Sequence, residues 1–281
     1  MSFDSSKVGA TRDSEEFRVN TVRLAQFAAA IDDANPAHAE GRTACPTFAN
    51  IPAMQCIVES LWSVTGQFGV HGEHDIHLHA PIVPGMRLFS RATVQGVQST
   101  SAGVSIVVKG VTRTHDGKPV NEQYLTYFVP RASLPRSSGE PAPDHRMTEG
   151  ATAKAPLAEA RYPMAMDQTR RYADASRDYS DYALDEAAAR AKGLDGILVH
   201  GMLTMALAGR LVVDKACGGD SARLKRLAVR FSRPVYLVPG QAITARIWRL
   251  GERDGRARIG FEAQNAAGDV VIRHGLAEVA A

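Results

Sequence analysis

The chain has 281 residues, of which 44% are hydrophobic and 22% are charged, and its formal net charge is +3. These values are ordinary for a soluble globular protein, and without a long block of Lys and Arg a nucleic-acid surface is not expected. No apolar run approaches the roughly 18 residues that a membrane-spanning helix needs. The cysteines, Cys45, Cys56 and Cys217, form no Cys-x-x-Cys pair, which predicts reduced thiols in a cytoplasmic protein.

The first predicted helix covers residues 22–31 and runs into the segment Asp33-Ala34-Asn35-Pro36-Ala37-His38. Pro36 disfavours the helical conformation at Asn35, so the chain is expected to turn there. A turn can bring the carboxylate of Asp33 and the imidazole of His38 to bear on one water molecule. Such a pair can add water to a small electrophile, or remove it, without a metal or a cofactor. An isolated Asp-x-Asn-Pro string is also a common turn with no chemical role.

The rest of the first half predicts a longer apolar helix over 48–66, interrupted early by Pro52, and then a strand that ends in a Pro-Gly turn over 77–85. Alternating strands over 104–114 and 121–129 are expected to form a hairpin around Asp116-Gly117. Residues 131–160 are rich in Pro, Ser, Gly and Ala, which is typical of an exposed linker. We therefore expect a first domain over 1–130, a linker over 131–160 and a second domain over 161–281.

The second half repeats this order of elements. Helices are expected over 168–176 and 201–217, a strand with a Pro-Gly turn over 230–240, and a hairpin of 256–263 with 270–279 around Gly268-Asp269. Each half thus predicts one long helix against an antiparallel sheet, an α+β arrangement. The second copy of the motif, Asp178-Tyr179-Ser180-Asp181-Tyr182-Ala183, keeps the carboxylate but has Ala183 in place of the imidazole.

Three features together resemble the MaoC-like dehydratase family of (R)-specific enoyl-CoA hydratases and 3-hydroxyacyl-thioester dehydratases. They are the complete Asp33–His38 motif, the segment Val199-His200-Gly201-Met202-Leu203, and the paired strand and Pro-Gly segments, the first preceded by His71-Gly72-Glu73-His74-Asp75. The resemblance covers nearly the whole chain and is closest to the double-hotdog form, similar to the hydratase 2 unit of peroxisomal multifunctional enzymes. It implies two tandem hotdog folds, each with a long central helix wrapped by an antiparallel sheet, that form a pseudo-dimer.

The chain departs from the pattern that this resemblance implies. The complete pair of acid and base usually lies in the C-terminal half, whereas here the front half carries it. In the rear half Arg177 stands where a small Gly is usual, and Ser180, Asp181 and Ala183 replace Asn, Pro and His. The sequence leaves open whether Arg177 is a solvated charge or fills the abandoned second pocket. Gly201 and Phe231 nevertheless stand where the family's substrate-contacting Gly and Phe fall.

The resemblance predicts a hydro-lyase of fatty acid metabolism that interconverts a 2-enoyl thioester and an (R)-3-hydroxyacyl thioester. Asp33 and His38 are the expected catalytic pair and Asn35 holds the motif. Pro46 has no N–H, so Thr47, or else Phe48, is expected to supply a backbone donor at a helix N-terminus. Gly201 is expected to support the site, with His200, Phe231 and Arg230 as substrate contacts. Acyl-CoA, or an acyl group on acyl carrier protein, is the expected substrate, and neither a metal nor a cofactor is required. A homodimer, or pairing with another hotdog subunit, is the expected assembly.

Other interpretations remain open from the sequence. The chain can be a non-catalytic partner subunit or an acyl-thioester-binding module, and hotdog proteins also include thioesterases. The histidines of 71–79 can suggest a metal site, but no Cys accompanies them. A basic group around the strand after the second central helix can contact CoA phosphates or form an ordinary solvated face: Arg223, Lys225, Arg226, Arg230 and Arg233.

Overall fold

The computed structural model describes residues 3–147 and 150–281. Its α-helices are α1 Thr21–Ala30, α2 Pro36–Ala39, α3 Met54–Val64, α4 Gln168–Ser176, α5 Glu186–Ala191 and α6 Gly201–Lys215. Its 3-10 helices are η1 Ser5–Lys7, η2 Pro46–Ala53, η3 Ala151–Ala153, η4 Asp181–Ala183 and η5 Ser221–Arg223. The strands are β1 Thr11–Asp13, β2 Phe17–Arg18, β3 Val70–Leu78, β4 Arg87–Ser99, β5 Gly103–Thr114, β6 Pro119–Pro130, β7 Ser138–Gly139, β8 Ala158–Pro163, β9 Leu224–Phe231, β10 Ala242–Arg253, β11 Arg256–Gln264 and β12 Val270–Ala280.

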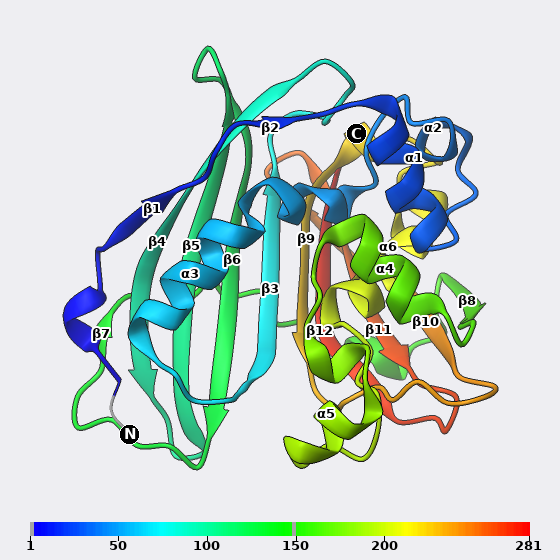
Figure 1. Ribbon diagram of the computed structural model, residues 1–281. Coiled ribbons are helices and arrows are strands. Elements are labelled where there is room, and N and C mark those ends of the chain that lie inside the picture. Colours follow the sequence, from blue (N-terminus) through cyan, green and yellow to red (C-terminus); the bar gives the residue numbers. More distant parts are fainter. Residues whose placement is uncertain (1–2, 148–149) are drawn as a thin grey trace.

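The described strands form one 12-stranded sheet in which the two halves follow one another in the order β1-β4-β5-β6-β3-β9-β12-β11-β10-β8. Strands β2 and β7 pair with β4 beside this path. The halves meet where β3 pairs antiparallel with β9, with Ile76 opposite Leu227. Helix α3 covers the front half of the sheet and α6 lies over the rear half (Figure 1). The α+β arrangement and the pseudo-dimer expected from the sequence are thereby confirmed.

The two central helices differ because their sequences differ. Eleven of the residues of α6 are buried, including Leu203 and Met205, as expected for a helix that is apolar on all sides. The front helix is broken, because Pro52 cannot donate the hydrogen bond of an α-helical interior. Residues 46–53 therefore form the 3-10 helix η2, and only residues 54–64 continue as the α-helix α3.

Two of the predicted strands were placed wrongly along the chain. The structure has β3 at Val70–Leu78 and β9 at Leu224–Phe231, before the segments 77–85 and 230–240 that the sequence favoured. Pro81, Pro84, Pro234 and Pro239 cannot donate to a strand ladder, so those segments leave the sheet. The two hairpins were predicted correctly, whereas β4 and β10 were not predicted.

The segment 131–160 is only partly exposed. It contains β7, which pairs with β4, and its last residues begin β8. His145 is 5% exposed, and the carbonyl oxygen of Asp144 accepts a hydrogen bond from Arg226 Nη2 at 3.1 Å. The connection between the halves therefore packs against the seam of β3 and β9, and the division into 1–130 and 161–281 remains a prediction.

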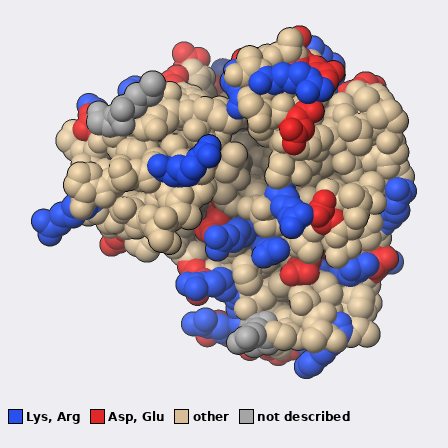
Figure 2. All heavy atoms as spheres, turned by 90° about the horizontal axis from the view of Figure 1, so that it is seen from below, with Lys and Arg blue, Asp and Glu red and all other residues tan. Residues whose placement is uncertain are grey.

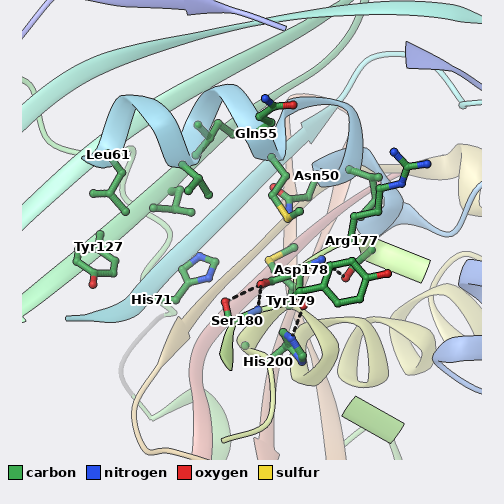
Figure 3. Close-up of a pocket in the computed structure, with 18 of the residues that line it drawn as sticks. Asn50, Gln55, Leu61, His71, Tyr127, Arg177, Asp178, Tyr179, Ser180 and His200 are labelled. Atoms are coloured by element: carbon green, nitrogen blue, oxygen red, sulfur yellow. Dashed lines mark hydrogen bonds between the residues drawn. The ribbon is translucent and has the colours of Figure 1, made fainter. Parts of the chain in front are cut away.

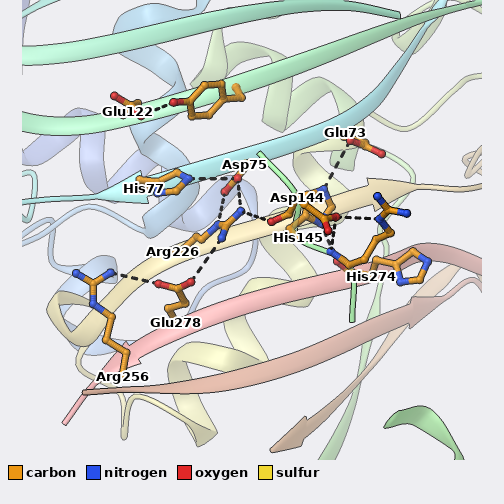
Figure 4. Close-up of polar contacts among 12 residues, drawn as sticks. Glu73, Asp75, His77, Glu122, Asp144, His145, Arg226, Arg256, His274 and Glu278 are labelled. Atoms are coloured by element: carbon orange, nitrogen blue, oxygen red, sulfur yellow. Dashed lines mark hydrogen bonds and ion pairs between the residues drawn. The ribbon is translucent and has the colours of Figure 1, made fainter. Parts of the chain in front are cut away.

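A buried ion pair joins the halves at this seam (Figure 4). Arg226 of β9 binds Asp75 of β3 through both ends of the carboxylate, with Nε–Oδ1 at 3.0 Å and Nη2–Oδ2 at 2.7 Å. His77 Nε2 lies 3.2 Å from Asp75 Oδ2, and Glu278 lies 3.5 Å from Arg226. Burial opposes ionisation of Asp75, but the bonds from His77 and Arg226 outweigh it and lower its pKa. The carboxylate is therefore charged and satisfied in the folded chain.

His145 adds a pH-dependent contribution to the same seam. Burial opposes its protonation, but Glu73 and the carbonyl of His274 outweigh burial and raise the pKa of His145. Nδ1 donates to His274 O at 2.9 Å, and Nε2 lies 3.7 Å from Glu73 Oε2. A raised pKa stabilises the fold below the unfolded value of about 6.5, and this stabilisation is lost as the pH rises through the folded value.

We therefore expect His145→Gln to lower the free energy of unfolding more at about pH 6 than at about pH 8. Urea denaturation of both proteins at the two pH values measures the difference. Glu73 does not reverse the sign in this range, because its pKa is lowered and its contribution is lost only in acid. An equal loss at both pH values would contradict the assigned ion pair.

Candidate active site

The front motif folds as its sequence predicts. Helix α1 ends at Ala30, and Asn35 turns the chain into α2, with Pro36 at the first helical position. The side-chain oxygen of Asn35 accepts a hydrogen bond from the backbone N–H of Ala37 at 3.0 Å. The backbone N–H of Asn35 donates to Asp33 Oδ1, also at 3.0 Å. These bonds are those of a capped turn. They hold Asp33 and His38 on the same side of it.

Asp33 and His38 contact each other directly. His38 Nδ1 lies 2.7 Å from Asp33 Oδ2, and the two side chains are 1% and 7% exposed, respectively. His38 Nε2 lies 3.0 Å from the hydroxyl of Ser221, in η5 of the rear half. Asn35 Nδ2 also reaches the rear half and donates to Gly219 O at 2.7 Å. The front motif is therefore completed by groups from the second repeat.

The electrostatics of the pair keep the carboxylate ionised. Burial opposes ionisation of Asp33, but hydrogen bonds from His38, the Asn35 N–H and Cys45 outweigh it and lower its pKa. Cys45 donates its S–H to Asp33 Oδ2 at 3.3 Å. Burial and the neighbouring Asp33 raise the pKa of Cys45 well above its usual value. Cys45 is therefore a neutral thiol that donates to a charged carboxylate.

A small crevice adjoins this pair. Its volume is about 30 Å³, and Cys45 and Ser221 lie on its wall with Lys225 and the segment 80–82. This volume holds one or two water molecules. An enoyl thioester does not fit into it in this conformation.

A much larger cavity of about 1280 Å³ lies at the rear motif (Figure 3). Typical small-molecule sites have about 300–1,000 Å³. The front half contributes apolar side chains to its wall, including Ile57, Leu61 and Trp62 of α3 and Leu125 of β6, and the rear half contributes others. Residues from the junction of η2 and α3, between Asn50 and Gln55, line the same wall. The cavity therefore lies between the two repeats.

The rear motif lines this cavity without an acid–base pair. Asp178 Oδ1 accepts hydrogen bonds from the N–H of Ser180 at 3.2 Å and from its hydroxyl at 2.6 Å, which preserves the turn. Ala183 is fully buried and supplies no proton-transfer group. His200 Nε2 donates to the carbonyl of Asp178 at 3.0 Å, and burial lowers the pKa of His200. His200 therefore fixes the helix entry as a neutral imidazole.

The structure separates the predicted site residues into two groups. Asp33, His38 and Asn35 meet at the front motif, but none of them lines either cavity; of the groups that bond to the pair, Cys45 and Ser221 reach the crevice. Thr47 lies in η2, and the N–H of the next residue, Phe48, already donates to Cys45 O at 2.9 Å. A donor role for Thr47 remains a prediction.

The other predicted residues lie elsewhere. His200, Gly201 and Phe231 line the large cavity, where Phe231 packs so closely that a Cβ on Gly201 would lie 3.2 Å from its ring. Arg230 lines neither cavity and lies 3.7 Å from Glu73.

Cys45 and Ser221 contact the pair but were not predicted. The sequence could have indicated Cys45, because it directly precedes Pro46 at the start of the first central helix. Ser221 has none, since it is 183 positions from His38 and joins it only through the pairing of the halves.

Asp33, His38 and Cys45 also place one potential metal ligand each within 4.8 Å of one another. His38 and Cys45 both already bond to Asp33 Oδ2 and Cys45 is a protonated thiol, so we assign no metal to them. Among the histidines of β3, His71 bonds to His74 at 3.1 Å and His74 bonds to Gln123 at 3.1 Å.

The fold and this site define a double-hotdog protein with a dehydratase-type motif. Solved structures agree on the fold: a MaoC-like dehydratase superposes with a TM-score of 0.82 at 21% identity, covering 98% of this chain and 99% of the other. A double-hotdog protein from Mycobacterium tuberculosis superposes with a TM-score of 0.67 at 14% identity, covering 99% and 97%.

Residues 148–270 match the family described as "MaoC like domain", and residues 6–123 match "FAS1-like, dehydratase domain region". The chain thus carries a MaoC-like dehydratase domain behind a FAS1-like dehydratase region, and the resemblance found in the sequence is confirmed.

Curated relatives are similar over most of the chain. A probable enoyl-CoA hydratase 2 of Dictyostelium discoideum is 23% identical over 74% of this chain and 69% of its own length. The 3-hydroxyacyl-thioester dehydratase Y of M. tuberculosis is 27% identical over 75% and 73%. The peroxisomal multifunctional enzyme type 2 of Mus musculus is 25% identical over 72% of this chain, which matches only 26% of that larger enzyme. Within the described residues, no helix has the length and apolar character to cross a membrane.

Proposed function

We propose that this protein hydrates a 2-enoyl thioester reversibly to the (R)-3-hydroxyacyl thioester, with Asp33 and His38 as the acid–base pair. The relatives are named hydratases and a dehydratase, so the hydro-lyase class expected from the sequence is confirmed. The observation that carries the assignment to the front motif is the contact of 2.7 Å between a buried carboxylate and a buried imidazole. Within the motif the rear repeat offers no imidazole, because Ala183 stands at that position.

In the proposed reaction the pair removes a proton from water as its oxygen attacks C3, and a proton is delivered to C2. The N–H of Thr47, at the start of η2, donates to the thioester oxygen as negative charge develops there. The hydroxyl of Ser221 bonds to His38 Nε2, so a water molecule must replace this hydroxyl during turnover. Substitution of Ser221 tests directly whether the hydroxyl competes with that water.

Turnover at the front motif also requires the crevice to widen. Its wall includes the loop segments 43–45 and 80–82 together with Ser221 and Ala222 of η5, while the strands contribute only their ends, Leu78 of β3 and residues 224–225 of β9. Such segments move more readily than a sheet and commonly open or close active sites. We propose that their displacement admits the enoyl group while the pair stays fixed on its capped turn.

The test is a turnover assay of the full chain with crotonyl-CoA and longer enoyl-CoAs. Loss of the enoyl thioester and formation of the (R)-3-hydroxyacyl product are expected. The same assay with enoyl groups on acyl carrier protein decides between the two carriers. No hydration of any chain length on either carrier would refute the proposed activity.

Thioester hydrolysis is a second candidate, favoured by the position of Ser221. Asp33 Oδ2, His38 Nδ1, His38 Nε2 and Ser221 Oγ follow one another at 2.7 and 3.0 Å, the connectivity of a nucleophilic triad. In that reaction Ser221 attacks the thioester carbonyl and passes its proton to His38. The thiol leaves with that proton, and water then releases the acid from the acyl-serine.

Ser221→Ala separates the two activities. It is expected to abolish release of free thiol from hexanoyl-CoA if hydrolysis occurs, and to leave hydration of crotonyl-CoA in place. Thiol release that persists in Ser221→Ala excludes the triad. A homodimer of double-hotdog units and a cytoplasmic location remain predictions, and size-exclusion chromatography with light scattering measures the first.

A further inference from the structure

The basic residues that line the large cavity are not equivalent. Three have carboxylate partners: Arg18 binds Glu16 at 2.6 Å, Lys192 binds Asp181 at 2.7 Å, and Arg233 binds Asp269. The other two, Arg23 and Arg177, have no carboxylate within 4.0 Å among the described residues. Figure 2 shows a face on which some Lys and Arg side chains lie beside Asp and Glu and others stand apart from them. Arg23 and Arg177 are distinctive because both line the same cavity without a carboxylate partner.

These two guanidinium groups lie close enough to repel each other. Arg23 comes from α1, is half-buried, and lies over the ring of Phe17 with its guanidinium carbon 4.7 Å from the ring centroid. Burial lowers the pKa of Arg23, and the positive charge of Arg177 lowers it further. Glu15, Glu59 and Asp178 also line the cavity but form no ion pair with either arginine. Neither guanidinium group therefore has a direct carboxylate partner, although the lining of the cavity as a whole contains as many acidic residues as Lys and Arg.

Arg177 is held in this place by an unusual backbone. It follows α4 with φ of +63°, the left-handed region where a glycine is usual. Its N–H closes the helix by donating to Ala173 O at 2.7 Å, so the turn needs only the backbone and not the side chain. Figure 3 shows Arg177 next to Asp178 and Tyr179 on the cavity wall. A residue other than glycine is unfavourable for the backbone at this position, and the guanidinium group of Arg177 gains no carboxylate partner among the described residues.

We propose that Arg23 and Arg177 form an anion-binding site that holds a carboxylate or phosphate group of a ligand whose apolar part lies in the large cavity. Guanidinium groups bind both anions through paired hydrogen bonds. The apolar wall around Ile57, Leu61 and Trp62 receives the rest of the ligand, while exposed Arg177 holds its charged end. The anion is a CoA phosphate or a carboxylate at the end of the acyl group. This inference does not depend on proton transfer by Asp33 and His38.

Four saturated thioesters, which cannot be hydrated, test the site by isothermal titration calorimetry. Hexanoyl-CoA carries phosphates only, adipoyl-pantetheine a terminal carboxylate only, adipoyl-CoA both, and hexanoyl-pantetheine neither. Arg177→Gly is expected to raise the Kd of a ligand that carries the recognised anion by about tenfold or more. Arg23→Gln is expected to do the same, and the double variant to add little, because the two groups share one anion.

The pattern of losses identifies the anion. A loss for both CoA thioesters but neither pantetheine thioester assigns a phosphate, whereas a loss for both adipoyl thioesters but neither hexanoyl thioester assigns a carboxylate. Quenching of Trp62 fluorescence on binding, absent in Trp62→Phe, is expected to place the ligand in the large cavity. The only other tryptophan, Trp248, is buried and does not line it.

Arg131→Gly is the matched control. Arg131 also has a positive φ, of +58°, is exposed, and does not line the cavity, so this change removes the same charge from the same kind of backbone position. It is expected to leave all four Kd values unchanged. Equal affinities in wild type and Arg177→Gly, an equal loss in Arg131→Gly, or no binding of any of the four thioesters would overturn the site. Each of these results leaves the hydration assay unaffected, so the two proposals fail separately.

Discussion

Asp33→Asn is expected to lower the rate of crotonyl-CoA hydration at least about a hundredfold, and His38→Ala by a similar factor, because each change removes one member of the proton-transfer pair. Asn keeps the shape of the Asp33 side chain and can still accept the bond from the N–H of Asn35. The turn should therefore survive while the negative charge is lost. Steady-state kinetics give the rates, and circular dichroism confirms that each variant is folded.

Asp178→Asn is the matched control for this experiment, since it makes the same change at the corresponding position of the rear motif. It is expected to alter the rate by no more than a few fold. If Asp178→Asn removes hydration and Asp33→Asn does not, the reaction takes place at the large cavity and the front pair is structural. Unchanged rates in both front variants would likewise refute the assignment of Asp33 and His38.

Arg226→Ala is expected to lower the free energy of unfolding by about 3–5 kcal/mol, because it leaves the carboxylate of Asp75 buried without its partner. The two side chains are 11% and 2% exposed, so water does not replace the lost hydrogen bonds well. The same change removes the bond to Asp144 O, which attaches the connecting segment to the seam. Urea denaturation followed by circular dichroism measures the loss.

Two further variants separate this effect from a general loss of an arginine. Arg91→Ala breaks an ion pair with Asp13 whose side chains are 62% and 61% exposed, and it is expected to change the free energy of unfolding very little, because water solvates both charges. The double change Arg226→Met with Asp75→Leu removes both buried charges and is expected to regain most of the stability lost in Arg226→Ala. A loss in Arg226→Ala no larger than in Arg91→Ala would show that the buried pair does not hold the halves together.

Local sequence signals predicted local structure well. Pro36 and Asn35 indicate a capped turn by themselves, and helices α1, α4 and α6 follow from the spacing of apolar residues over single segments. The two hairpins carry Asp116-Gly117 and Gly268-Asp269 at their turns, so they too are encoded within a few residues. The repeat of these elements was sufficient to predict an α+β arrangement in each half, and the resemblance to the MaoC-like family implied the pseudo-dimer.

Features that depend on contacts between distant segments were not predictable in the same way. The positions of β3 and β9 follow from their pairing with each other. The prediction relied instead on the Pro-Gly segments that follow them, and it therefore placed both strands too late in the chain. The contact of Ser221 with His38 requires the two halves to be docked. The large cavity requires the same docking, because α3 of the front repeat and the motif of the rear repeat both line it. The basic residues expected to contact CoA illustrate the same point. Arg226, one of them, binds Asp75 in the buried seam instead.

The presence of both repeats in one chain, with β3 hydrogen-bonded to β9 between them, has a consequence for how such a molecule can change over time. In a symmetric dimer of identical subunits every substitution appears twice, so both pockets gain or lose the same group together. Here each pocket is encoded by its own codons. An arginine acquired beside one pocket, or an imidazole discarded there, leaves the opposite pocket untouched, and the two ends of one molecule can therefore diverge toward separate tasks.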